Sequence, residues 1–224
     1  MLLFQTHFYT HVAPVIDGSP LYSNIKYYDV AGLDIDRALL DFLDLSNHES
    51  QVTRTLTTIK HSSCFVSNNK LYDLKNNEKF FTLPDGNKIE MSKGERFYAP
   101  EVLFNPEMLG NDVYKNGLQG VMNESFQKCS VDNRRTLYEN IVLTGGSSKL
   151  IGIEERLKLE LEKLYRPQSS IPKIDIKKDF SMYLPWIGAS CIAGLSSFDK
   201  MVVTKQDYDE SGFRVLGKRF LTGK

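Results

Sequence analysis

Apolar residues alternate along the chain between short strand-like runs and helical spacing, a pattern that is typical of α/β proteins. Residues 12–16 and 25–30 are strand-like and are separated by turn residues at 17–20, so they predict a hairpin. Within 34–43, and again within 52–59, apolar positions recur every three or four residues. This spacing places them on one face of a helix and predicts two consecutive helices after the hairpin.

A second hairpin and a short helix are predicted in the middle of the chain. Leu83-Pro84-Asp85-Gly86 lies between two strand-like runs, and such a turn uses proline to preset φ and glycine to accept a positive φ. Pro100 fits the first turn of a helix, where its missing N–H has no partner, so a short helix is predicted over 101–104. Residues 204–212 predict another helix, with a capping threonine at its start and a glycine at its end.

The strand-like run 141–145 leads through two glycines and two serines into a helical pattern over 151–164. Such a turn points unpaired backbone N–H groups and the positive end of a helix outward, which suits a phosphate group. The apolar positions that we expect to face the sheet are Ile153, Leu157, Leu161 and Leu164. The turn lacks the spacing of the two common glycine-rich nucleotide motifs, so plain chain reversal stays the alternative.

Charge and cysteine content exclude several function classes. The 28 Lys and Arg residues balance the 28 Asp and Glu residues, so no net positive field would attract nucleic acid or acidic lipid. No apolar run approaches the ~18 residues of a membrane helix. The three cysteines, Cys64, Cys129 and Cys191, are too widely spaced for a disulfide framework, which indicates a reducing compartment. His7 and His11 lie four residues apart, but their neighbours favour a strand, so no metal site is predicted.

Residues 138–147 read YENIVLTGGS and resemble the nucleotide-contacting strand and loop of the actin family. Other segments match the same family in family order, and together they span about Thr10 to Phe220. These segments are 10–14, 29–34, 83–86, 95–97, 100–106, 186–190 and 204–212. Several independent motifs therefore identify the chain as similar to actin or an actin-related protein.

The resemblance implies an α/β fold that is the C-terminal portion of the actin-like ATPase fold, with one nearly complete lobe and the tail of the other. It places residues 1–30 and 113–182 in a part like actin subdomain 3, and residues 31–112 in an insertion like subdomain 4. Residues 183–224 resemble a C-terminal part of subdomain 1. The family's first phosphate loop has no counterpart in this sequence, so we expect a truncated member.

The resemblance also implies a nucleotide cofactor, ATP or ADP with Mg or Ca, and locates the contacts that this chain keeps. Gly145, Gly146 and Ser147 match the phosphate and sugar loop, and Lys60 matches a ribose-side lysine. Met182 stands where the family has a lysine that contacts the nucleotide.

Other positions of the nucleotide site depart from the family pattern. Residues 4–8 lack the carboxylates and glycines of the second phosphate loop, His61 replaces an adenine-side glutamate, and Leu150 replaces an aromatic residue. His11 resembles a histidine near the attacking water, but on its own it is better interpreted as structural. Nucleotide binding is therefore expected to be weak or absent, with no catalytic residue.

Two regions of the chain resemble family interaction surfaces. The first is a set of apolar residues that matches a hydrophobic docking cleft: Ile187, Ile192, Leu195, Phe198, Met201 and Val202. The loop 110–117 resembles the family's plug but is polar, so plug function is not expected. The implied partners are actin or actin-related subunits and actin-binding proteins, with no nucleic acid and no membrane.

The sequence therefore predicts a truncated, divergent actin-family protein of the cytoplasm and cytoskeleton that acts as a structural or interaction subunit. The alternative is an actin-like, filament-forming ATPase whose N-terminal half is missing from this sequence. An ATPase needs metal ligands and phosphate cradles on both lobes, and this chain keeps about one of those elements.

Overall fold

The computed structural model describes residues 1–43, 49–67, 79–82, 86, 88–110, 116–164, 176–177 and 182–217. The chain divides into two compact units, Met1–Met182 and Tyr183–Lys224, and each is described by itself. The assignment of its segments to subdomains of the actin fold stays a prediction.

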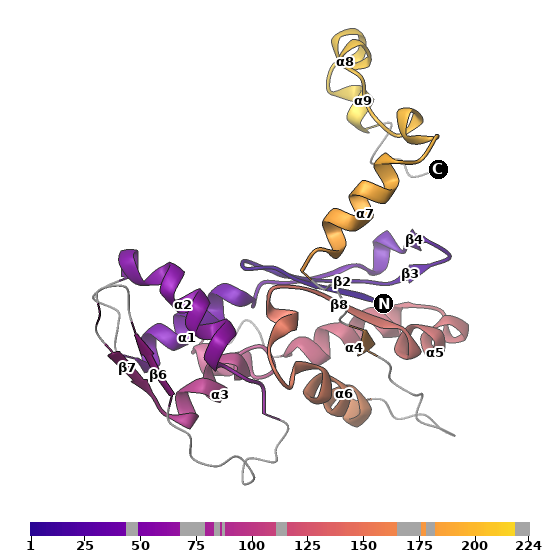
Figure 1. Ribbon diagram of the computed structural model, residues 1–224. Coiled ribbons are helices and arrows are strands. Elements are labelled where there is room, and N and C mark those ends of the chain that lie inside the picture. Colours follow the sequence, from indigo (N-terminus) through magenta and orange to yellow (C-terminus); the bar gives the residue numbers. More distant parts are fainter. Residues whose placement is uncertain are drawn as a thin grey trace. The chain divides into compact units, whose positions relative to one another are not determined.

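A five-stranded mixed sheet organises the first unit (Figure 1). Its strands, in spatial order, are β5 (Lys26–Tyr28), β2 (Thr10–Ala13), β1 (Leu2–Gln5), β8 (Ile141–Gly145) and β9 (Ile176–Lys177). The first three pair antiparallel, whereas β8 runs parallel to both β1 and β9. β1 and β8, which are far apart in the sequence, therefore lie side by side in the middle of the sheet.

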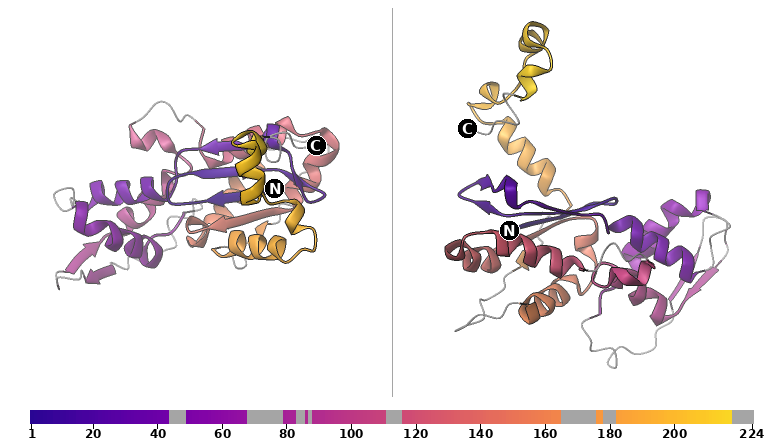
Figure 2. Two further views of the ribbon diagram at one scale, coloured as in Figure 1. Left: turned by 90° about the horizontal axis from the view of Figure 1, so that it is seen from above. Right: turned by 180° about the vertical axis from the view of Figure 1, so that it is seen from behind.

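Helices cover one face of the sheet, as Figure 2 shows from behind. They are α4 (Leu118–Lys128), α5 (Val131–Glu139) and α6 (Ile153–Leu164). Successive side chains of a strand point to opposite faces of the sheet, so each strand contributes apolar side chains to the core. These buried side chains include Leu3, Val12, Ile141 and Leu143. Three of the four predicted apolar positions of α6 are buried here, but Leu164 is exposed because it ends the helix. The predicted α/β class is confirmed.

The first predicted hairpin is present, but its strands are shorter than the sequence suggests. β2 pairs with β5 as expected, while the rest of the first run forms a separate pair, β3 (Val15–Ile16) with β4 (Ser19–Pro20). Asp17 and Gly18 both adopt positive φ in the turn between them. A turn with two positive φ values matches the twist of a short hairpin, which explains why the run divides there.

A second group of elements lies beside one end of the sheet (Figures 1 and 2). It contains α1 (Gly32–Phe42), α2 (Glu49–Ser63), α3 (Lys93–Glu101) and the antiparallel pair β6 (Lys79–Thr82) and β7 (Lys88–Met91). Both predicted helices and the second predicted hairpin are confirmed. Gly86 has φ +90°, as its turn requires, whereas residues 83–85 lie outside the described part.

The predicted helix over 101–104 is wrong, because α3 ends at Glu101 rather than beginning there. Ser92 caps the helix start by accepting the Glu95 N–H, which fixes the first turn eight residues before Pro100. Pro100 has no N–H to give to the carbonyl of Arg96, and that carbonyl accepts the N–H of Phe65 instead, at 3.1 Å. The proline thus sits in the last turn of the helix without leaving that acceptor unsatisfied.

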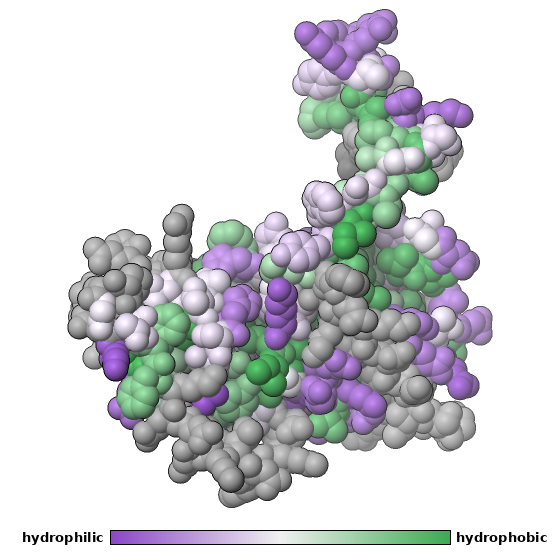
Figure 3. All heavy atoms as spheres, in the orientation of Figure 1, coloured by the Kyte–Doolittle hydropathy of each residue, from purple (hydrophilic) through white to green (hydrophobic). Residues whose placement is uncertain are grey.

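The second unit contains α7 (Leu184–Ala193), the 3-10 turn η5 (Phe198–Lys200), α8 (Lys205–Ser211) and α9 (Arg214–Leu216). Thr204 and Asp207 form the predicted reciprocal cap of α8, and Gly212 ends it with positive φ. None of the residues of α7 is buried, and apolar atoms are prominent over this unit in Figure 3. A helix that is apolar on all sides is typical of one covered in a larger assembly.

All three cysteines are free thiols, as predicted. Across the described ranges, no helix combines the length and the apolar character that a bilayer-spanning segment requires.

Candidate functional site

The two glycines of the predicted phosphate loop have different surroundings. Gly145 ends β8 with φ +97°, and a Cβ added there would lie 1.8 Å from the carbonyl oxygen of Gln5 on β1. Gly146 has ordinary helical φ and ψ, and an added Cβ would meet only the His61 ring, at 3.7 Å. Close packing of parallel strands therefore requires the first glycine, whereas the second could carry a Cβ in ordinary contact with His61.

The chain after these glycines differs from the predicted direct entry into a helix. Residues Ser147–Lys149 form the 3-10 turn η4, and the Ser148 hydroxyl donates to the carbonyl oxygen of Gly145 at 2.7 Å. Both serines are buried. Helix α6 begins only at Ile153, because the chain first bridges to the segment after α2 at Phe65. The positive end of α6 therefore does not directly follow the glycine pair.

Lys60 lies near this turn but is committed to protein partners. Its side chain is only 3% exposed, and Nζ lies 2.9 Å from Asp36 Oδ1. The same ammonium donates to the carbonyl oxygen of Gly32 at 2.9 Å. The Lys60–Asp36 contact is an ion pair without aligned hydrogen-bond geometry, since Oδ1 has no hydrogen-bond partner among the described residues. One of the three N–H groups of this ammonium thus bonds to Gly32, and its charge is paired with Asp36, both on α1.

Asp36 is a residue that sequence reasoning missed. It lies on the inward side of α1, where its carboxylate also accepts from the Thr57 hydroxyl at 3.3 Å and lies 3.8 Å from His7 Nδ1. The sequence does contain a signal for this ion pair. Asp36 is an acid next to the apolar Ile35 in the predicted helix 34–43, and Lys60 is a base directly after the predicted helical segment 52–59. Because a buried charge is costly without an opposite charge, such a pattern predicts an ion pair.

The loop between β1 and β2 is the segment that the sequence resemblance aligns with the family's second phosphate loop, and this alignment stays a prediction. The Thr6 hydroxyl oxygen accepts the N–H groups of Phe8, at 3.1 Å, and Tyr9, at 2.9 Å. The loop carbonyls are also used, because Thr6 accepts from Gly32 and His7 accepts from Leu33 at 2.6 Å. No Asp or Glu occurs before Asp17. The loop therefore offers a metal-bound phosphate neither a carboxylate ligand nor the N–H groups of Phe8 and Tyr9.

His61 is the residue whose ring lies beside Gly146. Burial and the adjacent Lys60 charge lower the pKa of His61, so the neutral imidazole is favoured. The structure thus brings Gly146 and His61 close together, whereas the Lys60 side chain contacts Asp36 and Gly32. Ser147 adjoins Gly146 in the chain but is buried.

Two other predicted residues lie elsewhere. His11 is in β2, stacked on Tyr9 with ring centroids 4.8 Å apart and edge-on to Tyr27 at 4.7 Å. Burial lowers its pKa. This aromatic packing supports the structural interpretation of His11. Met182 is an exposed residue at the end of the first unit, and no contact with the glycine pair appears among the described residues.

The predicted docking residues all belong to the second unit. Ile187, Ile192, Leu195 and Met201 are exposed, whereas Phe198 is half-buried. Larger exposed apolar groups in the same unit were missed by the sequence analysis: Tyr183, Trp186 and Phe213. Most of the plug-like loop, residues 111–115, lies outside the described part of the chain. Within that part, no group of three or more His, Cys, Asp or Glu residues could hold a metal ion.

Comparison with protein families gives a match over most of the chain. The family model described as Actin matches residues 43–221 of the 224. The matched range includes Lys60, the glycine pair and the apolar residues of the second unit, but not the β1–β2 loop. The chain belongs to the actin family.

Proposed function

We propose that this actin-family chain works as a structural or interaction subunit of the cytoskeleton and does not bind a metal-bound nucleotide. The observation that carries the proposal is the β1–β2 loop, where Thr6 accepts the N–H groups of Phe8 and Tyr9. Catalysis of phosphoryl transfer depends on positioned donors and a metal that neutralises charge. A loop that satisfies its own donors and carries no carboxylate supplies neither.

The Lys60 ion pair supports the same proposal. A lysine that binds a nucleotide needs an ammonium that is free to turn toward the ligand. Removing Lys60 from Asp36 would leave a buried carboxylate without its partner, at a cost of about 3–5 kcal/mol. The pair instead connects α1 with α2, since the two residues lie on these helices.

Isothermal titration of the full chain with magnesium ATP tests the nucleotide half of the proposal. We expect no saturable heat with millimolar ligand, while intact actin in the same buffer gives a binding isotherm. Gly146→Asp is the matched variant, because a Cβ added at Gly146 makes only ordinary contact with the His61 ring and a carboxylate there would repel phosphate. Magnesium-dependent binding by the chain that disappears in Gly146→Asp would refute the proposal.

Co-sedimentation with filaments of intact actin tests the interaction half. We expect the chain to pellet with filaments and Trp186→Ser to pellet less, since Trp186 is a large exposed side chain in the second unit. Tyr22→Ser is the control, because Tyr22 is equally exposed but lies in the first unit. Equal pelleting of both variants and the unchanged chain would count against this surface, and a chain that stays in the supernatant would count against the interaction role.

A second candidate function is weak binding of a nucleotide without metal. Two observations favour it: Gly146, where an added Cβ would meet only the His61 ring, and the fully buried amide of Gln5, which has no partner among the described residues. An unpaired buried amide costs about 1–3 kcal/mol, so a ligand or water that reached it would be stabilised. Saturable binding of ATP in the presence of a metal chelator would establish this candidate.

A further inference from the structure

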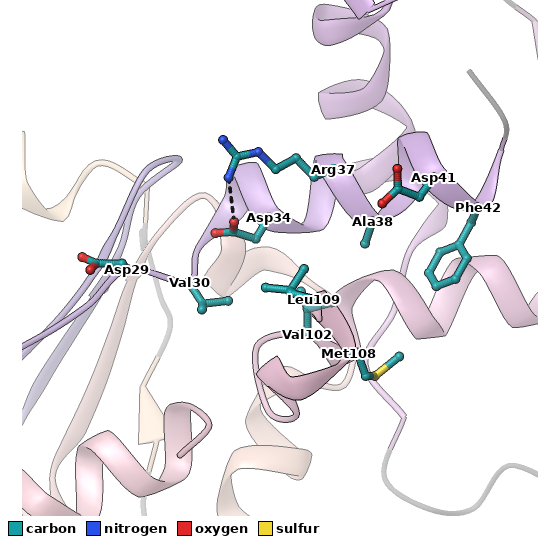
Figure 4. Close-up of a pocket in the computed structure, with 10 residues that line it drawn as sticks. All are labelled: Asp29, Val30, Asp34, Arg37, Ala38, Asp41, Phe42, Val102, Met108 and Leu109. Carbon is teal, nitrogen blue, oxygen red and sulfur yellow. Dashed lines mark hydrogen bonds and ion pairs between the residues drawn. The ribbon is translucent and has the colours of Figure 1, made fainter. Parts of the chain in front are cut away.

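A cavity of about 650 Å³ lies between α1 and the segment that follows α3 (Figure 4). One wall is formed by α1 and the two residues Asp29 and Val30 before it. Val102, which follows α3, and Met108 and Leu109 of the 3-10 turn η3 (Pro106–Leu109) form the other. Its volume falls within the range of ~300–1,000 Å³ that is typical of ligand sites. The cavity is separate from the glycine pair, which does not line it.

Helix α1 contributes a continuous stripe to this cavity. Asp34, Arg37, Ala38, Asp41 and Phe42 follow one another at spacings of three, one, three and one residues, which places them along one helix face. Figure 4 shows Asp34 and Asp41 along this helix with Arg37 and Ala38 between them. The stripe combines two acidic groups, one basic group and two apolar ones.

The charges of the cavity favour a cationic ligand. Three carboxylates, those of Asp29, Asp34 and Asp41, line it against one guanidinium, and Arg37 is already paired with Asp34 at 3.2 Å. Asp41 makes no ion pair with any residue in the described ranges and lies in the last turn of α1, which carries no basic residue. The carbonyl end of a helix disfavours an acid and favours a cation. A bound cation would therefore relieve an unfavourable interaction that the chain alone leaves in place.

The remaining lining is apolar. Val30, Ala38 and Val102 are buried at its floor, while Phe42 and Met108 are exposed at its rim. A bare metal ion is not the expected occupant, because no group of three or more His, Cys, Asp or Glu residues in the described ranges is placed to hold one. Anionic ligands such as nucleotides or acidic lipids would meet like charge. A cation attached to an apolar body satisfies both parts of the surface.

We propose that this cavity binds a short basic segment of a partner protein, in which a Lys or Arg lies next to a large apolar side chain. The cation would lie beside the carboxylate of Asp41, and the apolar side chain would pack on Phe42 and Met108. The volume accommodates a few side chains, and a basic segment complements the excess of carboxylates. The proposal goes beyond the proposed function, since the site is independent of nucleotide binding.

Fluorescence anisotropy with labelled, end-blocked Lys-Leu-Phe-Lys peptide on the full chain tests this site. We expect saturable binding that weakens with added salt, because part of the attraction is between exposed charges. Asp41→Asn should weaken it about two- to five-fold, as expected for loss of one exposed ion pair. Met108→Ser should also weaken it. Asp209→Asn is the matched control, because Asp209 is likewise an exposed acid near the end of a helix, α8, and should leave affinity unchanged.

Two further peptides separate the proposed occupant from other binders. Replacing both lysines by glutamate should abolish binding, and replacing Leu-Phe by two serines should reduce it strongly. Equal affinity of the serine peptide, or of spermidine, would mean simple charge attraction and would overturn the proposal. Equal effects of Asp41→Asn and Asp209→Asn would overturn it as well. Far-ultraviolet circular dichroism checks that both variants keep their helices, which Asp41→Asn should not weaken because it removes an unfavourable charge.

Discussion

At the scale of single residues, the adjacent glycines Gly145 and Gly146 show how one motif can serve two physical requirements. Gly145 combines positive φ with contact against the Gln5 carbonyl, so it holds β1 and β8 at strand distance. Gly146 has neither constraint. An added Cβ at Gly146 would meet only the His61 ring, at an ordinary contact distance.

Alanine substitution separates these two requirements. We expect Gly145→Ala to destabilise the chain by about 3 kcal/mol or more, from strained φ and from a Cβ that cannot fit. Gly146→Ala should be neutral or stabilising by about 0.4–1 kcal/mol, because alanine accepts this conformation and loses less entropy on folding. Urea unfolding of the two variants measures the difference. Similar losses of stability in both would show that the loop packs differently from the arrangement described.

At the scale of elements, Arg156 joins α6 to α3 and to the segment after α2. Its guanidinium makes two hydrogen bonds to the Glu101 carboxylate, at 2.7 and 2.8 Å, and one to Glu160 at 2.7 Å. It also donates to the Ser67 carbonyl and lies over the Phe104 ring. Burial opposes its charge, but the bonds to Glu101 and Glu160 outweigh burial and raise the pKa of Arg156.

Replacing this arginine should disrupt the contact between the elements. Arg156→Met is expected to cost about 3–5 kcal/mol, because the nearly buried Glu101 loses its partner. Arg135→Met is the matched control, since Arg135 also pairs with a Glu four residues later but on an exposed surface, and should cost at most about 0.5 kcal/mol. Thermal unfolding followed by circular dichroism measures both. Comparable costs would contradict the role of Arg156 in joining the elements.

The ion pairs of Glu160 in this network make the stability of the folded chain depend on pH. Burial alone would raise the pKa of Glu160, but Arg156 and Lys163 lower it overall. A carboxyl with a lowered folded-state pKa adds stability above its unfolded value of about 4.3 and loses it as pH falls through the folded value. The Arg156→Met chain should therefore lose less stability than the unchanged chain when acidified below this range.

At the scale of the whole molecule, the second unit exposes several large apolar side chains. Tyr183, Trp186, Leu195 and Phe213 are all at least half exposed. The chain carries no net charge to oppose association. Exposed apolar patches of this kind mark interaction surfaces.

Trp186 reports on this surface because it is the only tryptophan of the chain. It is 72% exposed, so its emission should be that of a solvated indole at low protein concentration and should shift to shorter wavelength as chains associate. Sedimentation equilibrium should show concentration-dependent association, and Trp186→Ser should reduce it. A species that stays monomeric at high concentration, with unchanged emission, would be inconsistent with an interaction surface in this unit.

Features of the chain that depend on neighbouring residues were predictable from sequence. The helices α1 and α2, the paired β6 and β7 and the cap at Thr204 follow from local spacing and turn residues. The helix near Pro100 was misplaced, because a proline is tolerated in a last turn when another segment uses the freed carbonyl, here through Phe65. The hydrogen bond from the Phe65 N–H to the Arg96 carbonyl joins residues that are far apart in sequence, so no local sequence pattern predicts it.

The sequence by itself determined the family, the α/β class and the absence of carboxylates from the β1–β2 loop, because composition and motif order are properties of the chain. Only the tertiary structure decided that Lys60 pairs with Asp36, that Gly145 packs against Gln5, and that the acidic stripe of α1 borders an apolar cavity. Each of these depends on distances between residues of different elements. Such distances are set by packing and strand pairing, and these can be read only from the folded structure.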